Sequence, residues 1–472
     1  MENSTTKTEV GERNSFITCR NSQGLEIRAT PLRMTRYLVV FEVYNPYSIL
    51  QLSEVLQEFK IVMNDRVVYS GRAVASNLVN TGLVLICEAT LDEGWIDVDV
   101  VAPVHQPEKL QEEFREFLKE WEKIYRVTPE FKVVIAEIQT LLADLRRWME
   151  QVELGVRSAA GNRQETEREV IKELQQPLLP TVNSIFGRFE KIAESVPQDL
   201  QPLHRTYVKR QIHPLVLCSP FAYRTYQKPL GYAGDYEMVN MIMRSPHEGS
   251  SLFAKTVNLW FWNQAPAEAH RNRIHYLTAR LDEETQRVVR LGRGAKILNL
   301  GCGPAGEIQR FLSEYDICDR ANFTLLDFND ETLQHTGKLL DELKRKYSRM
   351  TPIQMVKKSV HQVLKDGSRN NGSEKFDLVY CAGLFDYLSD RICKRLMNIF
   401  YDMLAPGGLL IATNVDASNP NRQTMEYVLE WHLIYRNSAQ LNALNPDNAT
   451  PGSFTVKADI TGVNIYLEVR KP

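Results

Sequence analysis

The residues best placed to do chemistry are three glycines and an aspartate in the second half of the chain. Gly301, Gly303 and Gly306 lie in the stretch NLGCGPAGEI and fit the pattern G-x-G-x-x-G. Glycines at this spacing allow a tight turn after a strand and let the backbone approach a ligand closely. Asp327 follows about twenty residues later, where a carboxylate can accept hydrogen bonds from both hydroxyls of a bound ribose. The pattern predicts a site for an adenosine-containing cofactor; a tight turn without a ligand is the alternative.

The elements around these residues alternate between strand and helix patterns from about residue 271 to the end. Strands are predicted at Lys296–Leu300, Phe323–Asp327, Phe376–Cys381 and Gly408–Thr413, with helical patterns between them. This alternation is typical of a doubly wound, Rossmann-like α/β domain. The final stretch, FTVKADITGVNIYLEVRK, predicts a β-hairpin instead. Because a typical NAD domain continues with parallel strands, the hairpin favours S-adenosylmethionine over NAD.

Four stretches together resemble the class I S-adenosylmethionine-dependent methyltransferases: ILNLGCGPAGEI, LLDFND, FDLVYCAGLFDYL and LAPGGLL. The resemblance covers about residues 270–472 and implies that S-adenosylmethionine is the cofactor. It implies a glycine loop against the methionine part, a ribose on Asp327 and an adenine beside Ser359 and Val360. The cofactor-binding residues implied in this way are Gly301, Cys302, Gly303, Pro304, Gly306, Asp327, Phe328, Ser359, Val360, Cys381, Ala382 and Gly383. Cys302 could also be a packing residue only.

A glycine- and tyrosine-rich stretch, YRTYQKPLGYAGDYEMVNMI at Tyr223–Ile242, precedes the α/β domain. It predicts a lid over the mouth of the cofactor site, and a structured linker is the alternative. The catalytic candidates are Tyr232, Asp235, Tyr236, Asp386 and Tyr387, and the substrate-binding candidates are Tyr226, Arg271, Arg422, Glu426 and Tyr435. Arg271 belongs to the stretch FWNQAPAEAHRNRIHYL, which also contains Asn263 and Arg273. Helical spacing predicts Tyr427, Trp431 and Tyr435 in one stripe, for which core packing is the alternative.

The stretches KPLGYAGDYEMVN, NLGCGPAGEI, LLDFND, YCAGLFDYLSD and NPNRQTMEYVLEWHLIYR are similar to one bacterial methyltransferase family. That family synthesises the extracellular factor 3-hydroxypalmitic acid methyl ester. The resemblance spans about residues 215–472 and implies a fatty-acid-like or other small carboxylate acceptor that becomes a methyl ester. A carboxylate is already ionised at neutral pH, so the reaction needs no strong base. Where amino methyltransferases of nucleic-acid bases carry N-P-P-Y, this chain has Cys381-Ala382-Gly383-Leu384, which counts against that activity.

The N-terminal part has a different pattern. Residues 1–15 are polar and predict a disordered tail, and residues 16–104 predict a small β-barrel, with a hairpin signal at Asn64-Asp65. The barrel is faintly similar to PilZ domains, which bind cyclic di-GMP. That resemblance would make Arg28, Arg33, Arg36 and Asn77 candidates for a cyclic nucleotide. The R-x-x-x-R spacing is absent and Val79 replaces a serine, so a barrel that binds no nucleotide, or that dimerises, is the alternative.

Residues 105–215 have the apolar stripes of amphipathic helices, as in LQEEFREFLKEWEKIY. These stripes predict a helical core or a homodimer seam, and a ligand groove is the alternative. The expected organisation is therefore a β-barrel, the helical segment, a lid at residues 216–270 and the methyltransferase domain at residues 271–472.

Bulk properties restrict the class of protein. The net charge of −2 gives no electrostatic indication of nucleic-acid binding. Seven dispersed cysteines lack metal-ligand spacing, so we expect reduced thiols, no metal site and a cytoplasmic protein. No signal peptide or membrane span is expected. The sequence thus predicts an S-adenosylmethionine-dependent methyltransferase. A cyclic di-GMP-responsive protein that uses the fold as a ligand sensor and a protein carboxyl methyltransferase are the competing functions.

Overall fold

The computed structural model describes residues 15–35, 37–43, 50–63, 66–81, 84–92, 111, 114, 115, 118, 126–158, 161–367 and 374–472. The predicted tail before residue 15, Arg36, the Asn64-Asp65 hairpin and most of the stripe at residues 110–125 lie outside these ranges. The chain divides into two compact units, residues 1–50 with 54–126 and residues 51–53 with 127–472. Each unit is described by itself.

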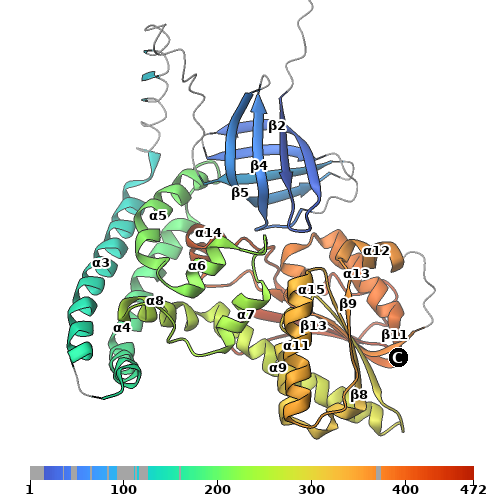
Figure 1. Ribbon diagram of the computed structural model, residues 1–472. Helices are drawn as coiled ribbons and strands as arrows, with labels where there is room; N and C mark the ends of the chain where they lie inside the picture. The colour runs from blue at the N-terminus through green and yellow to red at the C-terminus, as the bar shows by residue number, and fades with distance from the viewer. Residues whose placement is uncertain are drawn as a thin grey trace, which may run out of the picture. The chain divides into compact units, whose positions relative to one another are not determined.

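The first unit is a closed antiparallel β-barrel with the strand order β1-β2-β3-β6-β5-β4 (Figure 1). Its strands are β1 (Phe16–Arg20), β2 (Glu26–Thr35), β3 (Leu38–Val43), β4 (Val55–Met63), β5 (Arg66–Asn80) and β6 (Leu85–Leu91). Alternate side chains such as Ile17 and Cys19 point into an apolar interior that also contains Phe41 and Phe59. The barrel predicted from the short β-rich runs is confirmed.

The second unit begins with helices that pack into one apolar core. They are α3 (Pro129–Ser158), α4 (Arg163–Glu194), α5 (Gln201–Val216), α6 (Pro220–Gln227), α7 (Tyr236–Met243) and α8 (Leu252–Trp262). Phe131 of α3 contacts Phe189 of α4 with ring centroids 5.9 Å apart. Val134, Ile138 and Leu142 continue the same buried stripe at helical spacing. In the described part of this segment, the apolar stripes therefore form a core within one chain.

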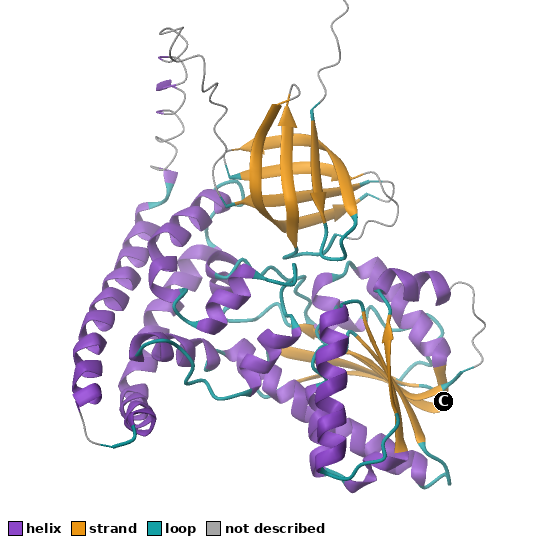
Figure 2. Ribbon diagram, in the orientation of Figure 1, coloured by secondary structure: helices purple, strands orange, loops and turns teal. Residues whose placement is uncertain are grey.

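A seven-stranded sheet in the order β12-β13-β11-β10-β7-β8-β9 completes the second unit (Figure 2). Its elements are α9 (Ala265–Val289), β7 (Ala295–Leu300), α10 (Gly306–Glu314), η2 (Asp316–Arg320), β8 (Ala321–Asp327), α11 (Asp330–Lys346), β9 (Ile353–Lys357), α12 (Val360–Gly367), β10 (Phe376–Cys381), η3 (Phe385–Tyr387), α13 (Asp390–Met403), β11 (Leu404–Val415), α14 (Arg422–Val428), α15 (Ser438–Asn442), β12 (Phe454–Ala458) and β13 (Asn464–Arg470). Residues of α9, α10 and α11 form the core on one face, and residues of α12, α13 and α15 form it on the other. The doubly wound fold and the terminal hairpin are confirmed.

One predicted helix is wrong beyond its first turns. The stripe of Tyr427, Trp431 and Tyr435 requires a continuous helix, but α14 ends at Val428. Glu430 adopts a positive φ of 49°, which a helix cannot contain. Tyr427 instead packs into the helical core, 5.9 Å from the ring of Phe131. The end of α14 is thus part of the same apolar core as α3 to α8.

Candidate functional site

The loop after β7 has the conformation that its glycines predicted. Gly301 and Gly303 have φ of 73° and 50°, in the left-handed region that favours glycine. A Cβ added at Gly303 would meet no atom within 4 Å, so the space beside this residue is open. At Gly306, by contrast, a Cβ would lie 3.0 Å from Ile274 Cδ1, because α10 begins there in close contact with α9. Gly306 therefore allows α10 to pack closely on α9, whereas Gly303 lies beside free space.

Asp327 is held directly beside this loop. Its Oδ2 accepts a hydrogen bond from the Gly303 N–H at 3.2 Å, and its Oδ1 accepts one from the Asn329 N–H at 3.0 Å. Burial raises the pKa of Asp327 above its ordinary value, while these backbone donors oppose the rise. A carboxylate fixed at the carboxyl end of β8 can accept the two hydroxyls of a ribose.

The other cofactor candidates lie at the same edge of the sheet. β10, β7, β8 and β9 are adjacent and parallel, so the residues that follow them meet at their carboxyl ends. Ser359 and Val360 follow β9, and Cys381 ends β10. The N–H of Gly383 donates to Thr413 Oγ1 at 3.0 Å, which fixes the turn after β10. The structure brings together the loops on which all the cofactor candidates lie, including Pro304 and Phe328.

Cys302 lies against the same carboxylate but has no acid–base role at neutral pH. Its Sγ is 4.0 Å from Asp327 Oδ2. Burial raises the pKa of the thiol well above its usual value, and the Asp327 charge adds to the rise. The side chain is therefore neutral, as the packing interpretation expects.

The stretch that is predicted to be a lid contacts the residues that follow β8 and the helix α11. The Tyr232 ring packs against Phe328 with centroids 5.1 Å apart, and its hydroxyl is 3.4 Å from Thr332 Oγ1. Tyr236 donates a hydrogen bond of 2.8 Å to Glu331 and stacks on His335 of α11. Burial raises the pKa of Tyr232, so its hydroxyl is a donor rather than a base.

Asp235 has two structural contacts. Its carboxylate accepts the N–H of Met238 at 2.8 Å and so caps α7. The same carboxylate forms an ion pair with Arg224 at 2.9 Å, and its side chain is only 2% exposed. These contacts account for a buried carboxylate without any contact to a ligand, as the structured-linker interpretation expects.

The remaining catalytic candidates follow β10. The Asp386 carboxylate accepts the N–H of Val415 at 2.6 Å, and burial raises its pKa. The Tyr387 hydroxyl accepts a hydrogen bond of 2.8 Å from Trp431 Nε1. A Cβ added at Gly234 would lie 3.1 Å from this hydroxyl, so the lid turn and the loop after β10 are in contact.

The substrate-binding candidates divide into separate groups. Arg422 pairs with Glu426 at 2.9 Å and lies over the ring of Tyr435 at 4.6 Å. Arg271 stacks on Trp262 at 3.7 Å and donates to its carbonyl. Tyr226 packs edge-to-face against His213 of α5 with ring centroids 4.5 Å apart. The structure thus gathers only Arg422, Glu426 and Tyr435 into one cluster, around α14.

Arg273 was not selected from the sequence as a site residue, yet its guanidinium lies beside Gly383. A Cβ added at Gly383 would be 3.0 Å from Arg273 Nη1. No sequence signal separated it from Arg271, because the two differ only in the face of α9 on which they lie.

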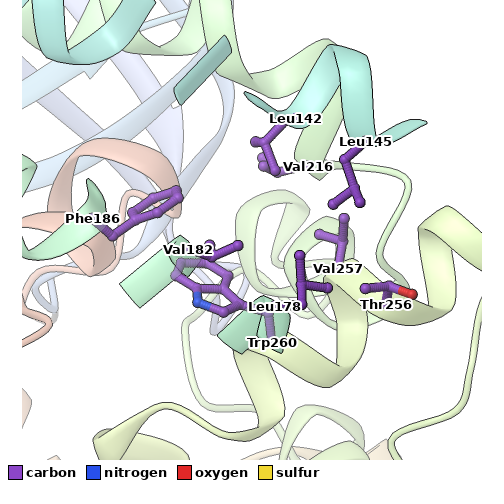
Figure 3. Close-up of a pocket in the computed structure, with 9 residues that line it drawn as sticks. All are labelled: Leu142, Leu145, Leu178, Val182, Phe186, Val216, Thr256, Val257 and Trp260. Atoms are coloured by element: carbon purple, nitrogen blue, oxygen red, sulfur yellow. The ribbon is translucent and has the colours of Figure 1, made fainter. Parts of the chain in front are cut away.

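Apolar side chains line a narrow pocket in the helical core (Figure 3). The lining residues are Leu142, Leu145, Leu178, Val182, Phe186, Val216, Thr256, Val257 and Trp260. The open space is only about the size of one water molecule, so it is a packing gap too small for an acyl chain.

The barrel does not bring its nucleotide candidates together. Arg28 and Arg33 are exposed on β2, and Asn77 is exposed on β5. These strands lie on opposite sides of the closed barrel, three steps apart in either direction. Arg28 lies over the Phe16 ring at 4.2 Å. One ligand therefore cannot contact these three side chains at once.

Among the residues that the structure describes, no group of three or more His, Cys, Asp or Glu side chains could hold a metal ion. None of the described helices is both long enough and apolar enough to cross a membrane.

One family model matches part of the second unit. Residues 298–410 match a family model described as a methyltransferase domain. A structure of a possible exported protein from Bordetella parapertussis is 19% identical, with 56% of this chain and 88% of that chain covered and a TM-score of 0.41. Magnesium protoporphyrin IX methyltransferase from Synechocystis PCC 6803 with bound SAH is 10% identical, with 57% and 99% covered and a TM-score of 0.34. A putative O-methyltransferase from Nostoc punctiforme PCC 73102 is 13% identical, with 54% and 70% covered and a TM-score of 0.33. No curated protein matches the chain. The region from β7 to β11 is therefore similar to a methyltransferase domain.

Proposed function

We propose that this chain is an S-adenosylmethionine-dependent methyltransferase. The observation that carries the proposal is the hydrogen bond between the Asp327 carboxylate and the Gly303 N–H, inside the region that matches the methyltransferase domain. It joins the ribose-binding group to the loop beside which space is open. Gly301 and Gly303 would lie against the methionine part, Asp327 would bind the ribose, and Ser359 and Val360 would line the adenine. S-adenosylmethionine supplies an activated methyl group when bound.

The proposed acceptor is a carboxylate of a fatty-acid-like or other small molecule. Its oxygen takes the methyl group with its own electron pair, which leaves a neutral methyl ester and S-adenosylhomocysteine. Burial raises the pKa of Tyr387, as it does that of Tyr232, so both hydroxyls stay protonated. Protonated hydroxyls can orient a carboxylate by donating hydrogen bonds, but they cannot act as bases. These side chains suit an acceptor that is already ionised.

A transfer assay tests this function. The purified protein is incubated with methyl-labelled S-adenosylmethionine and a bacterial lysate, and the label is measured in the organic extract and in the protein fraction. Because base hydrolyses a methyl ester, label that base releases as methanol from the organic extract supports the proposal. Base-labile label in protein instead supports the protein carboxyl methyltransferase. No transfer above that of an Asp327→Ala variant would contradict both.

A further inference from the structure

Arg273 lies at the point where the strand order of the sheet reverses. Its guanidinium is 3.0 Å from the position of a Cβ on Gly383, after β10. The next residue, Ile274, contacts the start of α10 at Gly306. β10 and β7 are neighbours, and the chain continues outward from them to β11 on one side and β8 on the other. Open α/β sheets bind ligands at this kind of reversal.

The positive charge of Arg273 has no ion-pair partner among the residues that the structure describes. The residue is only 9% exposed, and its Nη2 donates to the His270 ring at 3.0 Å. Burial lowers the pKa of His270 well below its usual value, and the Arg273 cation adds to this, so the ring is neutral. Within the part of the chain that the structure describes, no carboxylate forms an ion pair with Arg273. A buried guanidinium in this position strongly favours an anionic ligand.

Two carboxylates that feel the charge of Arg273 accept hydrogen bonds from other donors. Glu307 accepts from the Tyr380 hydroxyl at 2.7 Å, and Asp386 accepts from the Val415 N–H at 2.6 Å. Burial raises the pKa of both carboxyl groups, and Arg273 opposes the rise from beyond ion-pair distance. Neither group therefore satisfies the guanidinium.

A buried hydroxyl lies on the same face of the sheet as Arg273. The Tyr466 hydroxyl is buried and has no hydrogen-bond partner among the described residues. Its ring stacks on Tyr276 of α9 with centroids 4.1 Å apart, one helical turn from Arg273. Tyr466 pairs with Thr413, the residue whose hydroxyl holds the Gly383 N–H. Among the described residues, the end of β10 is thus flanked by a cation without a carboxylate partner and a hydroxyl without a hydrogen-bond partner.

We propose that Arg273 binds a ligand carboxylate beside Gly383, with the Tyr466 hydroxyl as a second donor. The inference rests on the proposed function, which provides two sources of that group: the methionine part of the cofactor and the acceptor. A charge-assisted, two-pronged contact from a guanidinium matches the planar shape of a carboxylate.

Calorimetry with matched ligands tests the proposal. S-adenosylhomocysteine carries the carboxylate, whereas 5′-methylthioadenosine has the same adenosine and sulfur without it. If the cofactor is the source, Arg273→Gln should bind S-adenosylhomocysteine about 10- to 100-fold more weakly and 5′-methylthioadenosine within about threefold of wild type. Arg273→Lys should restore part of the loss. Arg290→Gln, an exposed arginine at the other end of α9, is the control and should bind both ligands normally.

If the acceptor is the source, both nucleosides should bind normally, and Arg273→Gln should lose binding of dodecanoate to the protein saturated with S-adenosylhomocysteine. Equal binding of all three probes by wild type and Arg273→Gln would overturn the proposal. An equal loss of affinity for both nucleosides would also overturn it, because Arg273 would then stabilise the loop after β10 without contacting the carboxylate. If wild type binds neither nucleoside, the proposed function fails, and the inference fails with it.

Discussion

The Asp327 carboxylate accepts a hydrogen bond of 3.2 Å from the Gly303 N–H, which ties the carboxyl end of β8 to the loop after β7. In the proposed function, Asp327 would bind the ribose and Gly303 would lie against the methionine part of the cofactor, so each role depends on the position of the other residue. Because this contact joins the end of β8 to the loop after β7, substitutions at either residue should change binding of the cofactor.

Replacing Asp327 with alanine should weaken binding of S-adenosylhomocysteine by about tenfold or more, because two hydrogen bonds to the ribose are lost. Isothermal titration calorimetry measures the change. Asp330→Ala is a matched control, since Asp330 is exposed on α11 and pairs with Lys357 at the surface. Equal affinity of Asp327→Ala and wild type would remove Asp327 from the site.

Replacing Gly303 with valine should abolish cofactor binding. The added side chain would occupy the open space beside the loop, where no protein atom lies within 4 Å of its Cβ. The positive φ also adds backbone strain, so Gly292→Val is the control. Gly292 has a φ of 82° and open surroundings in the connection between α9 and β7. A folded Gly303→Val protein that binds normally would refute the close approach of the cofactor to this residue.

Binding should depend on pH through Asp327. Burial raises the pKa of this carboxyl, and the ionised form accepts the ribose hydroxyls. Affinity should therefore be full above the raised pKa and fall as the pH drops through it, at a higher pH than for an ordinary aspartate. Calorimetric titrations with S-adenosylhomocysteine from about pH 8 to about pH 4 would show the loss. Asp327→Asn should bind S-adenosylhomocysteine weakly and lack this pH dependence. The same pH profile in the variant and the wild type would show that a group other than Asp327 titrates.

Two variants of the lid should have different effects. Tyr232→Phe keeps the ring contact with Phe328 and removes only a hydroxyl donor, so turnover should fall about tenfold while cofactor affinity stays near that of wild type. Asp235→Ala removes a helix cap and the ion pair with Arg224, so it should lower the free energy of unfolding by about 1–3 kcal/mol. Its turnover per folded molecule should be preserved. Thermal melts and initial rates on the same preparations compare the two variants. Normal turnover of Tyr232→Phe would contradict the lid and favour the structured linker.

The barrel should be separable from cofactor binding. All the cofactor candidates belong to the unit formed by residues 51–53 and 127–472. A truncated chain that begins near Glu108 should therefore fold and bind S-adenosylhomocysteine as the full chain does. Circular dichroism reports folding and calorimetry reports binding. A helical, folded product without affinity would show that the barrel contributes to the site.

The sequence predicted the elements whose signals are local. The strands that end at Leu300, Asp327 and Cys381 are buried apolar runs followed by turn residues, and each is present at the predicted end. β9 was missed because it is an edge strand, and IQMVK is only partly buried. Edge strands lack the continuous apolar run that marks a central parallel strand.

The acceptor side was less predictable because its residues acquire roles through tertiary contacts. Asp235 is a catalytic candidate from its place in the sequence, but the contacts of its carboxylate with Arg224 and the Met238 N–H appear only in the folded chain. Glu430, two residues after the end of α14, has a positive φ that no sequence rule assigns to glutamate. Arg271 and Arg273 are two residues apart, and only the packing of α9 decides which guanidinium reaches Gly383.

A crystal structure of the protein with S-adenosylhomocysteine tests the central claim most directly. The account predicts the ribose hydroxyls within hydrogen-bond distance of the Asp327 carboxylate, the homocysteine part against Gly301 and Gly303, and the adenine beside Ser359 and Val360. Ligand bound at another edge of the sheet, or an empty loop after β7 at saturating ligand, would contradict it.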